Sequence, residues 1–291
     1  TVEASAQLNG VAHYKWKPSE KILAVAFDTP ICGWKGKRVN TLRLWNARPV
    51  DPIKLDQFNQ GDHIGAQVDT TQAESITRVL YPSDATPAGQ ELRLRQEYFF
   101  TSASLQDLLR RHLNQYGSLL NLAEKAAIQL NDTHPAIAIA ELMRLLIDEH
   151  NIAWDKAWEI TRATTAYTNH TLLPEALESW PVHLIERLLP RHMQIVYAIN
   201  AGIIADAHKQ GMVDFAFLEA ISLIDENNGR RLRMGQLAFA GTHSINGVSA
   251  LHSGLMKETV FKELNSLYPG RINNKTNGIT PRRWLAQANK P

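Results

Sequence analysis

The sequence predicts an α/β fold in which a parallel-rich sheet is covered by helices on both faces. From Lys125 onward, short apolar segments typical of strands alternate with longer segments of helical periodicity. The clearest unit is an apolar run that ends in the polar sequence Asn131–His134, after which Pro135 stands where a helix would begin. Alternation of this kind favours parallel strands that are joined by helices.

Residues 1–60 are predicted to be rich in strands. The run from Ile22 to Phe27 is almost entirely apolar, and the turn-forming sequence Asp28-Thr29-Pro30 follows it. Residues 41–45 alternate between apolar and polar side chains, which is typical of a half-buried strand.

The next segment is predicted to hold two helices and the loop between them. The helix over 63–80 is polar with few apolar anchors, so it needs a partner or stays exposed. A loop rich in proline, aspartate, serine and glycine follows over 81–89. Leucines at helical spacing then predict a helix over 98–113.

The remainder of the chain is predicted to build the sheet. The predicted strands cover 126–130, 166–169, 237–241 and 271–275. The predicted helices cover 135–149, 154–164, 183–209, 214–223 and 247–265. We therefore expect one α/β domain over 1–291, with a strand-rich part (1–60), a part with helices and a gate loop (61–124) and an alternating part (125–291).

Composition excludes several classes of function. The formal net charge is +2 and the basic residues are scattered, so nucleic acid is not an expected partner. Cys32 is the only cysteine, which rules out an internal disulfide framework and indicates a reducing, cytoplasmic compartment. No apolar run is long enough to span a bilayer, and no signal peptide is recognisable. Because the chain begins at Thr1, we expect a piece of a longer polypeptide.

The first candidate site follows the strand over 126–130. Asn131, Asp132 and His134 place an amide, a carboxylate and an imidazole at one strand end. In an open α/β sheet ligands bind at the carboxyl ends of the strands, so these groups could bind sugar hydroxyls or transfer protons. The competing interpretation is that Asp132 or Thr133 merely caps the following helix.

The second candidate follows the predicted strand over 237–241. It delivers His243 to a loop before a segment of helical periodicity. Gly241 and Gly247 would let the backbone approach a ligand closely. A histidine with a purely structural role is the competing interpretation.

The third candidate is the segment from Lys275 to Trp284. Thr280 fits a helix N-cap and Pro281 the first helical position, while Ile279 and Trp284 fit a hydrophobic staple. Four polar side chains remain unexplained by this local structure: Lys275, Asn277, Arg282 and Arg283. Asn277 precedes Gly278 in a tight turn that could present its amide to a ligand.

Several familiar chemistries lack a motif. The sequence contains no Walker loop, no Gly-x-Gly-x-x-Gly, no His-Glu-x-x-His, no Cys-x-x-Cys and no Gly-x-Ser-x-Gly. Metal, dinucleotide and serine-hydrolase functions are therefore unsupported, and no metal site is expected.

A set of short segments between about residue 21 and the end of the chain points to a known family. They are Asp28–Pro30, Asn40–Trp45, Glu91–Leu94, Gln96–Phe99, Gln129–Pro135, Tyr167–Thr171, Pro174–Glu178, Leu189–His192, Asn246–Val248 and Lys275–Trp284. In this order they resemble the α-glucan phosphorylases, the family of glycogen, starch and maltodextrin phosphorylase. Each segment alone is a weak signal, whereas the ordered set is specific.

The resemblance implies an enzyme. The family catalyses reversible phosphorolysis, in which orthophosphate cleaves a terminal α-1,4-linked glucose from an α-glucan and gives glucose 1-phosphate. Its fold is a glycosyltransferase of the B type with two Rossmann-like lobes, and this chain matches the later part of the N-terminal lobe. Pyridoxal phosphate is the family's cofactor and works in acid–base chemistry beside the substrate phosphate. The segment over 63–80 matches the contact through which family members form homodimers.

The resemblance also implies roles for five side chains. His243 matches the residue that contacts the reacting glucosyl unit, and Asn277 matches the asparagine that bonds the 6-hydroxyl of that sugar. Asp84 matches the carboxylate of a mobile loop that gates the site. Asp132 and His134 match polar residues of the channel near the sugar. We therefore expect the loops to meet at one sugar-sized hollow around His243.

The sequence departs from the family pattern in two respects. The gate loop commonly reads Asn-Asp-Asn in the family, whereas this chain has Ser83-Asp84-Ala85. Loss of the second amide should weaken a sugar contact. The glycine-rich loop that approaches the substrate phosphate is not in this chain, nor is the second lobe with the lysine that forms the Schiff base with pyridoxal phosphate. We therefore expect no turnover from this chain alone.

Other functions remain open at this point. A non-catalytic glucan-binding or dimerisation module would use the same surfaces, and a nucleotide-sugar glycosyltransferase shares the two-lobed fold.

We interpret Arg110 and Arg111 as cations that close the helix over 98–113 and complement its dipole. Arg110-Arg111 also recurs in unregulated members of the family that this chain resembles, so we do not predict regulation.

Overall fold

Four parallel strands form the sheet that organises the fold. The computed structural model describes residues 1–8, 11–173 and 177–289, and the sheet order is β11-β10-β6-β5. The strands are β5 (Ile128–Asn131), β6 (Thr165–Thr168), β10 (Ser244–Gly247) and β11 (Ile272–Asn274). Because every neighbouring pair is parallel, all four carboxyl ends lie at one edge, which we call the carboxyl edge. The predicted α/β class is confirmed.

The helices between β5 and β6 carry the centre of the hydrophobic core. They are α5 (Ala138–Arg144), its π-helical continuation Leu145–Glu149, and α6 (Trp154–Thr164). Every residue of α5 is buried, because Ile139 and Met143 point into the core while the polar side chains of the helix are paired inside it. The helices predicted over 135–149 and 154–164 are confirmed.

The chain between β6 and β10 is longer and contains a second, antiparallel sheet. Its helices are α7 (Val182–Leu188), α8 (Pro190–Lys209), α9 (Phe215–Ile221) and α10 (Met234–Gly241). Its strands are β7 (Ser179–Pro181), β8 (Ile224–Asp225) and β9 (Arg231–Arg233), in the order β7-β9-β8. The single helix predicted over 183–209 divides at Leu189, because the residue before a proline disfavours helical backbone.

The strand predicted over 237–241 is wrong, because these residues belong to α10. All of them are buried, and a short run that is apolar on every side fits a buried helix as well as a buried strand. The strand of this region is β10, which begins at Ser244. After it, the helix predicted over 247–265 is divided into α11 (Ala250–Glu258) and α12 (Lys262–Leu267).

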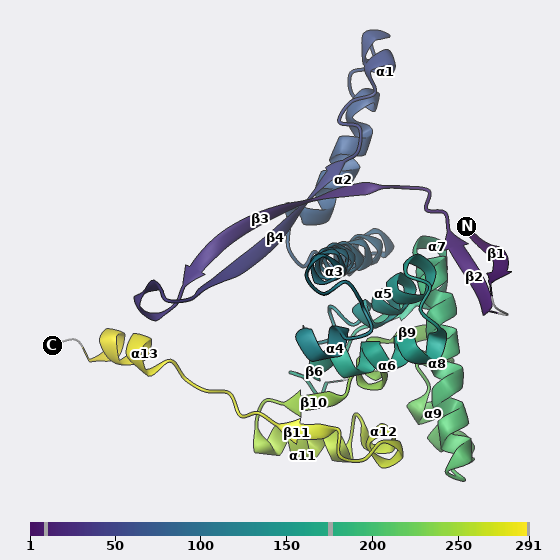
Figure 1. The fold of residues 1–291 in the computed structure, drawn as a ribbon, viewed down its shortest axis with the longest axis vertical. Coiled ribbons are helices and arrows are strands. Elements are labelled where there is room, and N and C mark those ends of the chain that lie inside the picture. The colour runs from purple at the N-terminus through teal and green to yellow at the C-terminus, as the bar shows by residue number, and fades with distance from the viewer. Residues whose placement is uncertain (9–10, 174–176, 290–291) are drawn as a thin grey trace.

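Strands dominate the N-terminal part, as predicted. β1 (Val2–Leu8) pairs with β2 (Val11–Trp16), and β3 (Ile22–Cys32) pairs with β4 (Val39–Pro49), both antiparallel. A short 3₁₀ turn, η1 (Trp34–Gly36), closes the second pair. β3 and β4 form a long ribbon that leaves the body of the molecule (Figure 1). Apolar side chains of this ribbon are exposed, with Phe27 at 56% and Leu44 at 60%.

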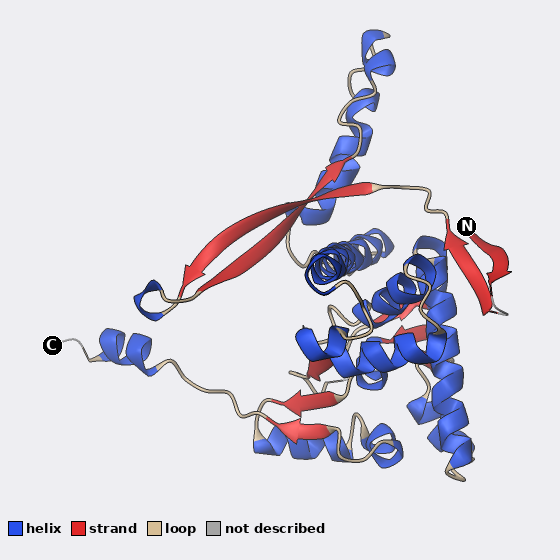
Figure 2. Cartoon of the chain, viewed as in Figure 1, coloured by secondary structure: helices blue, strands red, loops and turns tan. Residues whose placement is uncertain are grey.

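A helical arm also projects from the body (Figure 1). It contains α1 (Leu55–Asn59), the 3₁₀ turn η2 (Gly65–Gln67) and α2 (Val68–Arg78), so the predicted polar helix over 63–80 is confirmed in its main part. Figure 2 shows that this arm is helical to its tip, in contrast to the neighbouring ribbon of β3 and β4.

The long helix α3 (Pro87–Tyr116) runs across the body and is followed by α4 (Leu122–Lys125). Thr86 caps α3 by accepting the Gly89 N–H at 3.1 Å, and Gly117 ends it with a φ of 72°. The helix predicted over 98–113 therefore extends at both ends.

The interpretation of Arg110 and Arg111 as cations that close this helix is wrong. α3 continues to Tyr116, so neither arginine belongs to its last turn. Arg110 and Arg111 instead face Asp107 of the same helix, at 2.6 and 3.7 Å.

The last helix, α13 (Pro281–Ala288), begins as predicted with Thr280 at the N-cap and Pro281 in the first turn. The Thr280 side chain makes no capping hydrogen bond. Ile279 and Trp284 are 81% and 60% exposed, so the predicted hydrophobic staple is not buried. In the described part of the chain, no helix combines the length and the apolar character that crossing a membrane requires.

Candidate active site

The carboxyl edge of the sheet gathers polar side chains from several strand ends. His170 follows β6, and its Nε2 lies 2.6 Å from Asn131 Oδ1 at the end of β5. Gln129 Nε2 donates to Thr168 Oγ1 at 2.9 Å, and the Thr168 hydroxyl donates to Asn246 Oδ1 at 2.8 Å. These bonds run across three neighbouring strands, so they fix the strand ends relative to one another.

A second histidine, His252, reaches this edge from α11. Its Nδ1 accepts the Val248 N–H at 3.4 Å, so Nε2 carries the proton and donates to Asn169 Oδ1 at 2.9 Å. Burial lowers the pKa of His252, and the nearby His170 imidazole lowers it further. His252 is thus a neutral group that holds the buried Asn169 beside His170.

Asp132 continues the chain from β5 with an unusual backbone. Its φ is 65°, its N–H donates to Thr168 O at 2.9 Å, and its Oδ1 accepts the Thr133 N–H at 2.8 Å. Aspartate tolerates this left-handed conformation because its side chain bonds locally. Strained backbone of this kind clusters at functional sites.

Neither Asp132 nor Thr133 caps the next helix, so the capping interpretation is wrong. α5 begins only at Ala138, and its N-cap residue Ile137 makes no side-chain cap. The Thr133 hydroxyl donates instead to Glu178 Oε2 at 3.1 Å.

Tyr81 and Arg93 lie between His134 and Asp84 and connect the two residues. The half-buried His134 ring lies against Tyr81, with 4.7 Å between ring centroids, and the Arg93 guanidinium lies 3.7 Å from the Tyr81 centroid. Arg93 donates to Asp84 Oδ2 at 3.2 Å and to the carbonyl of Pro82. The gate loop, which we define as residues 81–86, is thereby fastened to the first turns of α3 and placed next to the loop after β5.

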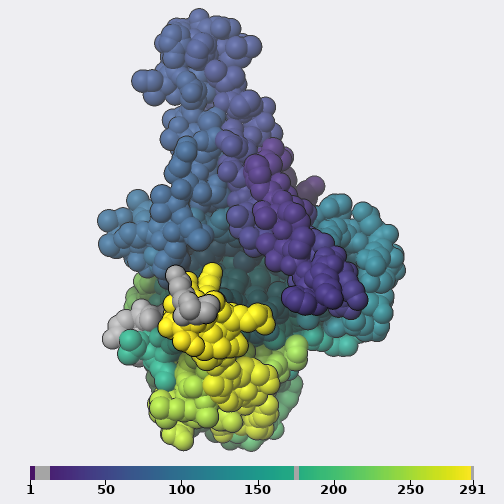
Figure 3. All heavy atoms as spheres, turned by 90° about the vertical axis from the view of Figure 1, so that its left-hand side faces the viewer, coloured from purple at the N-terminus to yellow at the C-terminus, as the bar shows by residue number. Residues whose placement is uncertain are grey.

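Asn277 is brought to the same edge by the chain that leaves β11. Lys275 N–H donates to Gly247 O and Asn277 N–H donates to Val248 O, each at 3.0 Å. These bonds hold the segment across the end of β10, and both Lys275 and Asn277 are exposed. Figure 3 looks onto this side of the molecule, where the surface is hollowed between the purple ribbon of β3 and β4 and the yellow C-terminal segment.

His243 is not at this edge, and the expected convergence around it is wrong. Because 237–241 is helical, His243 precedes β10 instead of following a strand. Its N–H donates to the carbonyl of Thr165, the first residue of β6, at 3.2 Å, and its Nδ1 lies 3.1 Å from Arg162 O. The imidazole is therefore exposed at the opposite, amino edge of the sheet.

The histidine at the carboxyl edge that the sequence reasoning missed is His170. The signal was available, because His170 comes directly after the predicted strand over 166–169 within the segment Tyr167–Thr171. His243 was predicted in this place because 237–241, which is helical, was expected to be a strand.

The predicted role of two glycines in ligand approach is also wrong. A Cβ on Gly241 would lie 2.4 Å from Ile139 Cγ2, and a Cβ on Gly247 would lie 2.4 Å from Ser253 Oγ. Both glycines therefore admit neighbouring parts of this chain, namely α5 and α11, and not a ligand.

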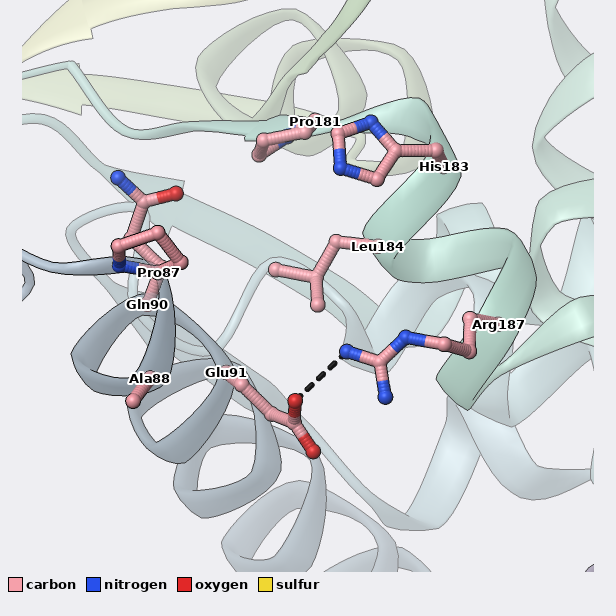
Figure 4. Close-up of a pocket in the computed structure, with 8 residues that line it drawn as sticks. All are labelled: Pro87, Ala88, Gln90, Glu91, Pro181, His183, Leu184 and Arg187. Atoms are coloured by element: carbon pink, nitrogen blue, oxygen red, sulfur yellow. Dashed lines mark hydrogen bonds and ion pairs between the residues drawn. The ribbon is translucent and has the colours of Figure 1, made fainter.

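A separate cavity of about 310 Å³ lies between the start of α3 and α7 (Figure 4). Its lining residues are Pro87, Ala88, Gln90, Glu91, Pro181, His183, Leu184 and Arg187. Its two charged groups, Glu91 and Arg187, already form an ion pair at 2.6 Å. No residue that follows a strand of the parallel sheet lines it, so it is distinct from the carboxyl edge.

The described residues do not form a site for a metal or for pyridoxal phosphate. No group of three or more histidine, cysteine, aspartate or glutamate side chains within the described ranges could hold a metal ion. A Schiff-base lysine needs a sheltered amine, yet the described lysines are exposed apart from the half-buried Lys156, which pairs with Glu159 at 2.9 Å. The described residues therefore do not supply the Schiff-base lysine of the cofactor that the family resemblance implies.

Comparison with known proteins agrees with this architecture. Residues 1–291 match the family described as carbohydrate phosphorylase. The chain is 47% identical over 290 residues to a glycogen phosphorylase of Haemophilus influenzae, covering 98% of this chain and 35% of that protein. It is 48% identical to the muscle form of glycogen phosphorylase from Ovis aries, with 94% and 34% covered, and 48% identical to a glycogen phosphorylase of Synechocystis, with 94% and 32% covered. The chain thus spans about a third of the length of these relatives.

Proposed function

Since the chain belongs to the carbohydrate phosphorylase family, we propose that it supplies the sugar-binding edge of an α-glucan phosphorylase. The complete protein would catalyse reversible phosphorolysis of terminal α-1,4-linked glucose by orthophosphate, with glucose 1-phosphate as product. The single observation that carries this proposal is the His170–Asn131 contact, because it aims an ordered imidazole at the place where a parallel sheet binds ligands.

The chemistry of His170 suits a sugar hydroxyl. Asn131 Oδ1 can only accept a hydrogen bond, so His170 Nε2 carries the proton and donates to it. In the neutral ring, Nδ1 is then a free acceptor, and it is the atom that would accept a hydrogen bond from the sugar. We assign to His170 the contact with the reacting glucosyl unit that was expected of His243.

Four further side chains complete the proposed site. Asp132 and His134 would line the channel beside the sugar, and Asn277 would bond its 6-hydroxyl through the side-chain amide. Asp84 would act from the gate loop, where Arg93 holds its carboxylate. The support for these roles is their common position at the carboxyl edge, together with the ability of carboxylate, imidazole and amide groups to bind hydroxyls.

The cofactor and the cell compartment are part of the same proposal. Pyridoxal phosphate, which the family implies, would be bound by residues outside this chain, because the lysines described here face solvent or pair on the surface. A cytoplasmic location is supported by the single cysteine, Cys32, which is free and exposed.

We further propose that the helical arm contacts a second copy of the protein. Ile64 at 85% and Leu80 at 77% exposure are large apolar side chains on or beside the arm that nothing in the described chain covers. The support is this exposed apolar surface and the resemblance of 63–80 to the dimer contact of the family. Light scattering of the complete protein and of an Ile64→Glu variant would test it, and an unchanged dimer in the variant would contradict it.

The proposed activity is tested with the complete protein, maltoheptaose and orthophosphate. Release of glucose 1-phosphate is the expected result. Transfer of glucose from a nucleotide-glucose donor without phosphorolysis would overturn the proposal in favour of a nucleotide-sugar glycosyltransferase. Binding of maltoheptaose with neither reaction would favour a non-catalytic glucan-binding module.

A further inference from the structure

Two buried carboxyl groups lie side by side beneath the proposed site. Glu97 of α3 is 7% exposed, the Glu178 side chain is 8% exposed, and the two carboxyls are within hydrogen-bonding reach of each other. Glu97 Oε2 accepts the Trp180 indole N–H at 3.2 Å, and Glu178 Oε2 accepts the Thr133 hydroxyl at 3.1 Å. The other oxygen of each carboxyl, Oε1, has no hydrogen-bond partner among the described residues.

The surrounding charges cannot neutralise two carboxylates. The permanent cation beside the pair is Arg93, whose Nη1 lies 4.0 Å from Glu178 Oε1 and is already bonded to Asp84. His134 Nε2 lies 3.9 Å from Glu178 Oε1. The Tyr81 phenol also lies near the pair but carries no positive charge. The Arg93 guanidinium must therefore compensate the charges of two glutamates and of Asp84.

A proton shared by Glu97 and Glu178 would remove the excess negative charge and would also give both Oε1 atoms a hydrogen-bond partner. Two carboxylates that occupy one buried site cannot both ionise cheaply, and an O–H···O⁻ bond between them is short and strong. Burial raises the pKa of Glu97 well above its usual range, and the charge of Glu178 raises it further. The two orphan oxygens then become donor and acceptor of one bond, and one negative charge remains opposite Arg93.

We propose that Glu97 and Glu178 share one proton, and that this bond makes Glu97 a positioning residue that holds the gate loop against the loop after β5. Glu178 contacts the loop after β5 directly and the gate loop through the Arg93 side chain. It accepts the Thr133 hydroxyl next to His134, and it faces Arg93, which holds Asp84 and Tyr81. Glu97 fixes Glu178 in this place from the rigid helix α3.

Loss of the proton should loosen both loops together. Two adjacent negative charges repel, and we expect Glu178 to move, because Glu97 belongs to the long helix α3 and also accepts the Trp180 indole N–H. A shift of Glu178 would release the Thr133 hydroxyl and disturb Arg93. The shared proton involves only residues of this chain, so the loosening of the two loops is expected whichever ligand binds the carboxyl edge.

The wild-type protein provides the first test. Carbon-13 NMR of glutamate carboxyl groups should show one resonance that titrates far above the ordinary glutamate range, and it should disappear in Glu97→Gln, whose amide donates permanently to Glu178. Glu258→Gln, on the exposed face of α11, is the matched control and should leave this resonance in place. A wild-type spectrum in which no glutamate resonance titrates above the ordinary range would overturn the proposal without any variant.

Amide hydrogen exchange supplies the readout of position. After correction for intrinsic pH dependence, exchange in residues 81–86 and 132–134 should accelerate as the pH passes the raised midpoint, because the repulsion between two carboxylates favours the open loops. In Glu97→Gln the acceleration should vanish, whereas a purely structural role of Glu97 predicts no pH-dependent difference between the proteins. Identical pH profiles for both would contradict the positioning role. A missing phosphorolysis activity would leave these outcomes unaffected.

Discussion

His170 Nε2 lies 2.6 Å from Asn131 Oδ1, although the two residues are 39 positions apart in the sequence. The contact exists because β5 and β6 are parallel neighbours whose register pairs Asn131 with Thr168. Polar residues that follow the two strands therefore arrive at the same point. His243 lies at the other edge, because it precedes its strand.

The first prediction distinguishes these two histidines. His170→Ala should lower kcat/KM for maltoheptaose phosphorolysis by the complete protein about tenfold to a hundredfold, as expected for the loss of a hydrogen bond to the reacting sugar. His243→Ala should leave kcat/KM nearly unchanged, because its imidazole lies at the amino edge, where its hydrogen-bond partner among the described residues is the Arg162 carbonyl. The reverse pattern in steady-state kinetics would return the role to His243.

The second prediction concerns the gate loop. Asp84→Asn removes the charge that faces Arg93 and should raise KM for the glucan more than it lowers kcat, since Asp84 positions a loop. The Asp84 side chain is 50% exposed, so the free energy of unfolding should change by less than about 1 kcal/mol. Glu159→Gln, which breaks the exposed pair with Lys156, is the control for a lost surface charge and should leave KM unchanged.

The third prediction is a pH dependence of stability that originates in the buried cluster of Glu141, Arg144 and His192. Burial lowers the pKa of His192 from 6.5, so the unfolded chain binds a proton that the folded chain rejects. The free energy of unfolding should therefore fall as the pH falls below about 6.5. Burial alone would raise the pKa of Glu141, but its hydrogen bonds to His192 and Arg144 outweigh burial and lower the pKa to about 2. Glu141 therefore adds a second loss of stability as the pH falls below the ordinary pKa of a glutamate.

Urea unfolding at pH 7 and at pH 5.5 measures this dependence. His192→Gln keeps a hydrogen-bond donor for Glu141 but cannot titrate, so its free energy of unfolding should fall less between the two pH values than that of the wild type. His208→Gln replaces an exposed histidine in the last turn of α8 and should behave like the wild type. Equal slopes for the wild type and His192→Gln would contradict the assignment.

The fourth prediction tests why Gly241 is small. Gly241→Ala forces a methyl group to within 2.4 Å of Ile139 Cγ2, which should destabilise the fold by about 1–3 kcal/mol. In helix α11, a Cβ at Gly254 would meet no atom of the described residues within 4 Å, so Gly254→Ala should instead stabilise the fold by about 0.4–1 kcal/mol.

A double-mutant cycle separates the steric clash from other causes. Ile139→Ala should cost less in the Gly241→Ala protein than in the wild type, because the removed side chain is the one that clashes. Additive effects in thermal or urea unfolding would show that Gly241 is required for another reason.

Much of the fold could be read from local patterns. The helices over 135–149 and 154–164 and the strands near 128, 166 and 272 have distinct periodicity or clear polar ends, and the structure contains them. The run 237–241 failed because it is buried on all sides, so its period carries no information. This one misassigned segment reversed the position of His243 relative to the sheet.

The sequence by itself determined the α/β class, the family and the candidate loops after β5 and β11, because these depend on residue types and their order along the chain. Only the tertiary structure decided which side chains share the carboxyl edge. It replaced His243 with His170, assigned Gly241 and Gly247 to packing, and brought Glu97 beside Glu178 across 81 positions. The physical reason is that strand direction and helix packing set distances in space, and no local pattern of residues encodes them.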